Sequence, residues 1–129
     1  MKNILPQDLS IRLKIISELG HNLNKDSTVL DFGCGSGKKV KDLRECGFKA
    51  YGCGTRFNKE EGIDTDLLIK EGILRVVSLE NYVLPFEDHS FDFIFSESVF
   101  EHVKNYPESI SELSRILKPD GICLHTFVS

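Results

Sequence analysis

The sequence predicts a single α/β domain built on a sheet of five parallel strands. Short segments rich in apolar and β-branched residues alternate with helical segments, which is typical of parallel strands joined by right-handed crossovers. The first predicted strand runs directly into a glycine-rich turn that precedes a helix. The chain of 129 residues is long enough for one core and too short for two. We therefore expect one domain over residues 1–129, with an N-terminal helix at 8–19 and a core at 28–128.

Helix signals occur in four segments. They cover residues 8–19, 38–46, 64–70 and the stretch that opens at Asn105. The last of these has an apolar stripe at helical spacing, formed by Ile110, Leu113, Ile116 and Leu117. Asn105 is expected to cap the start of this helix, because its side chain can accept a hydrogen bond from a free backbone N–H group. Pro107 suits the first turn.

The predicted strands are short and apolar. They cover residues 28–32, 49–53, 73–79, 91–96 and 122–128. A turn at residues 118–121 is expected before the fifth strand, because Pro, Asp and Gly follow one another there. In parallel sheets of this kind a ligand binds at the carboxyl ends of the strands, beside the first strand. The glycine-rich turn occupies that place.

Composition and charge narrow the range of partners. The formal net charge of −4 argues against nucleic acid or an anionic membrane as the main partner, because those surfaces attract a basic face. No apolar run approaches the length of a membrane span, and the first residues lack the apolar core of a signal peptide. The four cysteines have no metal-ligand spacing. We therefore expect no metal site, no membrane partner and reduced thiols in a cytoplasmic protein.

The most informative segment is Val29–Gly37. A buried strand that contains Asp31 is followed there by glycines at every second position. Glycine has no Cβ, so its backbone can pass very close to a ligand. The helix that starts beyond the turn offers unpaired N–H groups beside that ligand. This segment therefore predicts a binding site for a nucleotide-like molecule.

Two phosphate-binding motifs fit this turn poorly. A P-loop needs the pattern GxxxxGK[ST], whereas the spacing here is shorter and Lys39 stands where Ser or Thr is required. A dinucleotide fingerprint needs GxGxxG, and Lys38 occupies the position of its third glycine. A nicotinamide-dependent oxidoreductase is therefore a weak alternative.

The segment 31–37 closely resembles the first motif of class I S-adenosylmethionine-dependent methyltransferases. Residues 84–94 resemble the segment that enters the fourth strand of that family, residues 96–103 resemble the segment after it, and residues 117–121 resemble the turn before the fifth strand. The resemblance is strongest to the small-molecule group often called type 11. It implies a Rossmann-like three-layer sandwich with strand order 3-2-1-4-5, S-adenosylmethionine as cofactor and a small-molecule methyl acceptor.

The resemblance also implies which residues bind the cofactor. The turn is expected to lie against the methionine end of the cofactor through Gly33, Cys34, Gly35 and Gly37. Asp31 either holds the ammonium group of the cofactor or braces the loop. Glu80 matches the family acid that accepts a hydrogen bond from the adenine amino group, and Asn81 beside it offers a backbone N–H to the ring. Ser96 is expected at the methionine end of the pocket.

One position departs from the family pattern. The second strand of the family usually ends with Asp or Glu, whose two oxygens hold both ribose hydroxyls, whereas Gly54 stands there in this sequence. Losing such a contact costs about 1–3 kcal/mol if buried hydroxyls stay unpaired. Thr55, Arg56 and residues 58–61 are the candidates to compensate. The departure keeps a second function open, that of an inactive cofactor-binding or scaffold module.

His102 is the candidate catalytic residue. It follows Glu101 in a segment that faces the methyl-transfer site in the family. A neutral imidazole there can accept a proton from the hydroxyl or amine that is methylated. The alternative is a histidine on a helix surface or in packing. Methyl transfer depends mainly on in-line positioning and a dry pocket, so an enzyme of this kind does not require the base.

The resemblance implies a truncated sheet. The family has seven strands, whereas five are predicted here. The fifth strand would then form an exposed edge, which invites pairing with another chain. We therefore expect a homodimer that is joined through this edge.

Overall fold

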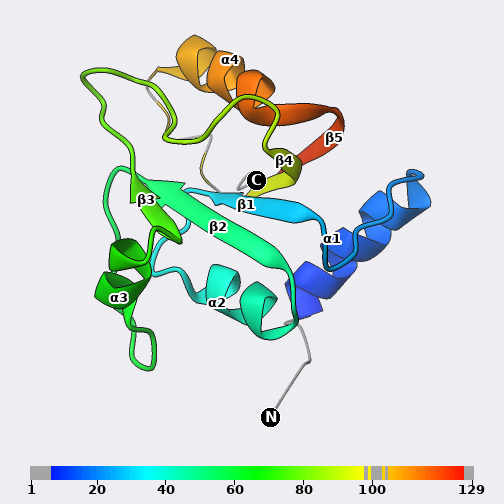
Figure 1. The fold of residues 1–129 in the computed structure, drawn as a ribbon, viewed down its shortest axis with the longest axis horizontal. Coiled ribbons are helices and arrows are strands. Elements are labelled where there is room, and N and C mark those ends of the chain that lie inside the picture. Colours follow the sequence, from blue (N-terminus) through cyan, green and yellow to red (C-terminus); the bar gives the residue numbers. More distant parts are fainter. Residues whose placement is uncertain (1–6, 98, 100–102, 104, 127–129) are drawn as a thin grey trace.

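The computed structural model of the protein describes residues 7–97, 99, 103 and 105–126. Its core is a sheet of five parallel strands in the order β3-β2-β1-β4-β5, which confirms the predicted order (Figure 1). The strands are β1 (Thr28–Phe32), β2 (Lys49–Gly54), β3 (Leu74–Val76), β4 (Phe91–Glu97) and β5 (Leu117–Thr126). The helices are α1 (Gln7–Glu18), α2 (Lys38–Glu45), α3 (Thr65–Lys70) and α4 (Tyr106–Ile116). Within the described residues, no helix combines the length and the apolar character that a membrane crossing requires.

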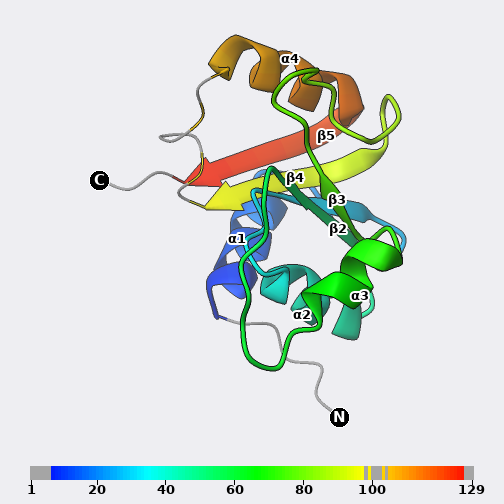
Figure 2. The ribbon, with the colours of Figure 1, turned by 90° about the vertical axis from the view of Figure 1, so that its left-hand side faces the viewer.

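Helices cover both faces of the sheet and give the predicted three layers (Figure 2). α1, α2 and α3 pack on one face, and α4 packs on the other. Neighbouring residues of β1 alternate between the two cores: Val29 faces the core under α1 and α2, and Leu30 faces the core under α4. Because both faces are buried, the strands are nearly continuous apolar runs in the sequence.

β2 and β4 each end one residue later than predicted, and β3 and β5 differ more from their predicted bounds. β3 ends at Val76, because Val77 donates the last backbone bond to the carbonyl oxygen of Gly54 at 2.9 Å and the chain then leaves the sheet. β5 begins at Leu117, so the predicted turn at residues 118–121 is part of an irregular strand start, where the pairing with β4 shifts register. Residues 127 and 128 of the predicted fifth strand lie outside the described residues.

The buried face of α4 is rotated relative to the predicted stripe. Leu113 and Ile116 are buried as predicted, whereas Ile110 is 46% exposed and Ser109 is fully buried. Ser109 tolerates this burial because its hydroxyl donates to the hydroxyl of Tyr82 at 2.7 Å. A satisfied polar pair therefore takes the place that the periodicity assigned to an apolar residue.

Two arginines hold the long connection between β3 and β4. Arg115 of α4 donates to the carbonyl oxygens of Leu84 and Phe86, each at 2.9 Å. Its guanidinium also pairs with Glu112 at 2.8 Å, and this contact is the main reason that the pKa of Glu112 is lowered. Arg75 of β3 donates to the carbonyl oxygen of Pro85 at 2.8 Å. Charge-assisted bonds of this kind are stronger than neutral ones, so they fix the course of a loop without regular structure.

Gly37 links the glycine-rich turn to α2. Its φ of 91° is left-handed, and a Cβ on this residue would lie 2.7 Å from Cδ1 of Leu74 in β3. Any other residue at this position would therefore strain the backbone and overlap with the core. The turn can connect β1 to α2 at this distance only because position 37 has no side chain.

We predict that Gly37→Ala lowers the free energy of unfolding by about 2–4 kcal/mol. This sum combines roughly 1–2 kcal/mol of left-handed backbone strain with roughly 1–3 kcal/mol of overpacking. Gly62→Ala is the matched control, because Gly62 has a φ of 84° and open space around the missing Cβ. It should show the strain alone. Urea unfolding measures both variants, and equal losses would contradict the packing contribution.

Candidate functional site

The glycine-rich turn begins where β1 ends. The N–H groups of Gly33 and Cys34 donate to the carbonyl oxygen of Cys53 in β2, at 2.8 and 3.1 Å. Gly33 and Gly35 have left-handed φ values of 79° and 61°. A Cβ on Gly33 would lie 2.6 Å from Cγ2 of Val99. The main chain at Gly33 therefore has no room for a side chain. Its backbone atoms border directly on the cavities described below.

The loop that follows β2 braces this turn from the other side. The N–H of Asn58 donates to the carbonyl oxygen of Gly35 at 3.1 Å. The hydroxyl of Ser36 donates to Glu60 at 2.6 Å, and the hydroxyl of Thr65 donates to the carbonyl oxygen of Ser36 at 2.8 Å. The turn is thus fixed by main-chain and side-chain groups of residues 58–65.

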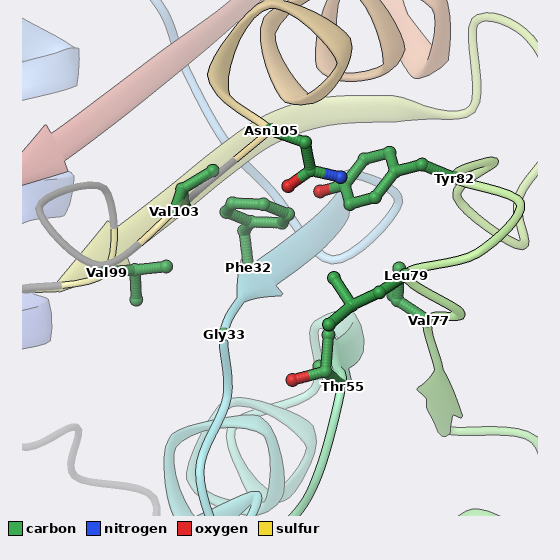
Figure 3. Close-up of a pocket in the computed structure, with 10 residues that line it drawn as sticks. Phe32, Gly33, Thr55, Val77, Leu79, Tyr82, Val99, Val103 and Asn105 are labelled. Carbon is green, nitrogen blue, oxygen red and sulfur yellow. The ribbon is translucent and has the colours of Figure 1, made fainter.

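A cavity of about 300 Å³ opens on one side of Gly33, and we call it the apolar compartment (Figure 3). Its lining comes from the ends of β1 and β2, the chain beyond β3 and the segment before α4. The lining residues are Phe32, Gly33, Gly54, Thr55, Val77, Leu79, Tyr82, Val99, Val103 and Asn105. Among them, the polar side chains are those of Thr55, Tyr82 and Asn105. This compartment suits a largely flat, uncharged group with a few polar atoms.

A second cavity of about 550 Å³ lies on the other side of the turn, and we call it the polar compartment. Its lining residues are Asp31, Gly33, Cys34, Gly35, Ser36, Lys38, Lys39, Asn58, Lys59, Glu60 and Glu97. Gly33 is common to both compartments. The two spaces therefore border the same residue, Gly33, where the main chain is bare.

The polar compartment carries both signs of charge. Asp31 is 5% exposed and lies at the base of this space. Glu97, at the end of β4, pairs with Lys39 of α2 at 2.8 Å and with Arg12 of α1 at 3.4 Å. The hydrogen bond from Lys39 is the main reason that the pKa of Glu97 is lowered. A group with its own positive and negative charges would find partners for both in this compartment.

The structure brings most of the predicted cofactor residues to these two spaces. Asp31, Gly33, Cys34 and Gly35 line the polar compartment, and Gly54 and Thr55 line the apolar one. Gly37 lies behind the turn against β3. Glu80 and Asn81 are exposed, and they stand between Leu79 and Tyr82, which line the apolar compartment. His102, the predicted catalytic residue, lies outside the described residues.

The thiol of Cys34 is not a nucleophile at neutral pH. Burial, and next the nearby charge of Asp31, raise its pKa well above the ordinary range. The same two causes raise the pKa of Cys53 to about 12. Both thiols stay protonated under physiological conditions, which agrees with a packing role for Cys34 within the turn.

Ser96 is placed differently from the polar residues around the turn. It is fully buried, and its hydroxyl lies 2.5 Å from Nδ1 of His125, its neighbour in β5. Burial lowers the pKa of His125 to about 4, so the imidazole is neutral at physiological pH. This pair lies on the α4 side of the sheet, and neither residue is among those that line the two compartments.

Sequence reasoning missed Tyr82, Asn105 and Glu97 as site residues. Asn105 is the N-cap residue of α4, as expected, but its side chain does not make the expected capping hydrogen bond. Its amide lines the apolar compartment instead (Figure 3). A local signal existed for Glu97, which directly follows the predicted strand end at Ser96. No local signal marked Tyr82 or Asn105, because their roles depend on a cavity formed by distant segments.

Comparison with known proteins decides the family. Residues 5–129 match the family described as a methyltransferase domain. The chain belongs to this methyltransferase domain family. The two compartments of the methyltransferase domain, which share Gly33, lie at the carboxyl ends of its strands. A ligand site in a parallel sheet is expected at this place.

Individual relatives support the same family. The methyltransferase domain is 31% identical over 116 residues to a demethylmenaquinone methyltransferase of Staphylococcus epidermidis, a match that covers 81% of this chain and 45% of the relative. It is 29% identical over 102 residues to a sterol 4-C-methyltransferase of Caenorhabditis elegans, covering 77% of this chain and 30% of the relative. The chain thus spans less than half the length of these curated relatives.

A solved structure shares the fold of the methyltransferase domain. It is phosphoethanolamine N-methyltransferase 2 of Haemonchus contortus, in complex with phosphomonomethylethanolamine and S-adenosylhomocysteine. The TM-score is 0.66 and the sequence identity is 25%, over 96% of this chain and 30% of that chain. The relationship therefore extends over nearly the whole of the present chain.

We predict that acidification destabilises the protein through His125. In the unfolded chain this imidazole takes up a proton near its ordinary pKa of 6.5, whereas the folded chain binds that proton only near pH 4. The unfolded state therefore binds more protons in this window, so stability is lost as the pH falls through it. Urea unfolding between about pH 7 and pH 4.5 measures the loss. His125→Gln should lose less stability than the wild type, and an equal loss would contradict the assignment.

Proposed function

We propose that the chain is an S-adenosylmethionine-dependent methyltransferase domain that acts on a small-molecule acceptor. The observation that carries this proposal is the meeting of an apolar and a charged compartment at the bare main chain of Gly33. S-adenosylmethionine has an adenosine at one end, an amino-acid group with both charges at the other and no phosphate. Family membership and a relative that holds S-adenosylhomocysteine support the same conclusion.

The residues of the chain fit this cofactor in a definite orientation. In the proposal, the amino-acid group lies along Gly33–Gly37 in the polar compartment, where Asp31 holds its ammonium and Cys34 packs within the loop. Ser96, near the end of β4, stands at the methionine end. The adenosine lies in the apolar compartment, beside Gly54 and Thr55. Glu80 accepts a hydrogen bond from the adenine amino group, and Asn81 donates its backbone N–H to the ring.

The protein contributes to the reaction mainly by positioning the reacting groups and by excluding water from them. When bound, the cofactor supplies an electrophilic methyl group on a positively charged sulfur. The bare backbone of Gly33 lets that sulfur lie at the junction of the compartments, while Val99 and Val103 exclude water from it. His102 is proposed to accept the proton of the acceptor where the acceptor carries one.

The proposed acceptors are small molecules. The relatives are named for methylation of a sterol and of demethylmenaquinone. Nucleic acid is not a proposed partner, because the formal net charge is −4.

An alternative function is a cofactor-binding or scaffold module without activity. Gly54 favours it, because this residue ends β2 in the apolar compartment without a carboxylate for the ribose. Binding of the cofactor without methyl transfer to any tested small-molecule extract would support the module over the enzyme.

We also propose that the protein is cytoplasmic and that it forms a homodimer. The four cysteines, all within the described residues, are free thiols, which supports a reducing compartment such as the cytoplasm. β5 is the outer strand of the described sheet and pairs there with β4, so its other edge supports a homodimer. Light scattering at high protein concentration tests this assembly, and a monomer would contradict it.

Calorimetric titration with three ligands tests the proposed function. We expect S-adenosylmethionine and its demethylated product S-adenosylhomocysteine to bind, because each has the apolar and the zwitterionic part that the two compartments accept. NAD should not bind, because its phosphates find no glycine-lysine cradle of the required spacing. The absence of heat with the first two ligands would refute both the enzyme and the module.

Restoring an acid at position 54 should strengthen cofactor binding. A Cβ on Gly54 would lie 3.2 Å from the carbonyl oxygen of Arg56, so a small shift accommodates a side chain. We predict that Gly54→Asp tightens S-adenosylhomocysteine binding about tenfold, because the carboxylate pairs with both ribose hydroxyls. Gly62→Asp adds the same charge at an exposed position and should leave the affinity unchanged. Unchanged affinity in Gly54→Asp would place the ribose elsewhere.

A further inference from the structure

The Asn105 amide is available inside the apolar compartment. It stands directly before α4, where an asparagine normally caps the helix, yet its side chain makes no capping bond. The backbone carbonyl of Asn105 still accepts the first helical bond, from the N–H of Ser109 at 3.0 Å. The helix therefore starts without help from the amide, which turns toward the cavity (Figure 3).

Tyr82 brings a second polar group to the same end of the compartment. Its hydroxyl accepts a hydrogen bond from Ser109 at 2.7 Å, and Ser109 is one helical turn beyond Asn105. This bond fixes the ring and leaves the phenolic hydrogen free for a ligand. Burial raises the pKa of Tyr82, so the group is a donor at neutral pH. The phenol and the amide thus belong to one rigid arrangement at the start of α4.

The apolar surroundings of the Asn105 amide and the Tyr82 hydroxyl make these two groups selective between ligands. Their neighbours in the lining are apolar side chains, namely Phe32, Val77, Leu79, Val99 and Val103. In such an environment a polar atom that loses its water must find a partner, and a mismatch is costly. The polar end of the compartment therefore discriminates between ligands by the pattern of their donors and acceptors.

We infer that Asn105 and Tyr82 form the base-reading pair of the domain and select an adenine ring. An asparagine amide pairs with adenine through two bonds, since its oxygen accepts one hydrogen of the amino group and its nitrogen donates to the adjacent ring nitrogen N7. The other hydrogen of the amino group is left for Glu80. The Tyr82 hydroxyl donates to a further ring nitrogen. The inference rests on the proposed function and adds the residues that determine its cofactor specificity.

Replacing the adenine amino group by an oxygen tests this assignment. The wild-type chain is titrated with S-adenosylhomocysteine and with S-inosylhomocysteine, which differ only in the base. The wild type should prefer the adenine ligand by about tenfold to hundredfold, because the Asn105 oxygen faces another acceptor in the inosine ligand. Asn105→Ala should weaken binding of the adenine ligand and reduce the preference at least about fivefold, and the preference that remains is assigned to Glu80.

Tyr82→Phe should give a different signature from Asn105→Ala. The Tyr82 hydroxyl is proposed to donate to a ring nitrogen that is an acceptor in both bases. Binding of both ligands should therefore weaken equally. Asn22→Ala removes the same amide at an exposed position and is the control for the substitution itself. The unfolding midpoint of Asn105→Ala should match the wild type, whereas a capping residue would lower the midpoint and leave the base preference unchanged.

The outcomes separate this inference from the proposed function. A wild type that binds both ligands equally, or an Asn105→Ala variant that keeps the full preference, would overturn the inference and leave cofactor binding intact. A preference lost in Glu80→Ala but kept in Asn105→Ala would assign the amino group to Glu80 alone and overturn the inference. A wild type that binds neither ligand would overturn the proposed function and this inference together.

Discussion

The site depends on one constraint, which is that the main chain leaving β1 has no room for a side chain. At Gly33 the N–H bonds to the carbonyl oxygen of Cys53 at 2.8 Å, and a Cβ would meet Val99 at 2.6 Å. The backbone is therefore held between β2 and the segment before α4. Gly33 lines both compartments and places no side chain between them, and this is the basis of the proposal that one extended ligand occupies both.

The two compartments differ in chemistry because different elements form their walls. The apolar compartment extends the core under α4, so its walls are the same kinds of side chains that fill that core. The polar compartment faces the first turn of α2 and the end of β4, which contribute Lys39 and Glu97 as a pair at 2.8 Å. A molecule with an uncharged aromatic end and a zwitterionic end matches both walls, which links the fold to the proposed cofactor.

Local signals in the sequence were sufficient for the parallel sheet and the glycine-rich turn, whereas the strand order was implied by the family resemblance. Apolar runs and glycine spacing depend only on neighbouring residues. The side chains that depend on distant partners could not be predicted. Ser109 is buried in place of Ile110 because its hydroxyl finds Tyr82, 27 residues away. Asn105 has the right type and position for a cap, and its actual direction follows from a cavity that four separate segments enclose.

The central claim is that one ligand spans both compartments across Gly33, and an NMR titration with the two halves of the ligand tests it. Adenosine should shift the amide signal of Thr55, and homocysteine should shift that of Gly35. S-adenosylhomocysteine should shift both, together with Gly33, and should bind at least about a hundredfold more tightly than either half, because the halves are joined. Competition between adenosine and homocysteine for one site, or shifts confined to one compartment with the joined ligand, would contradict the account.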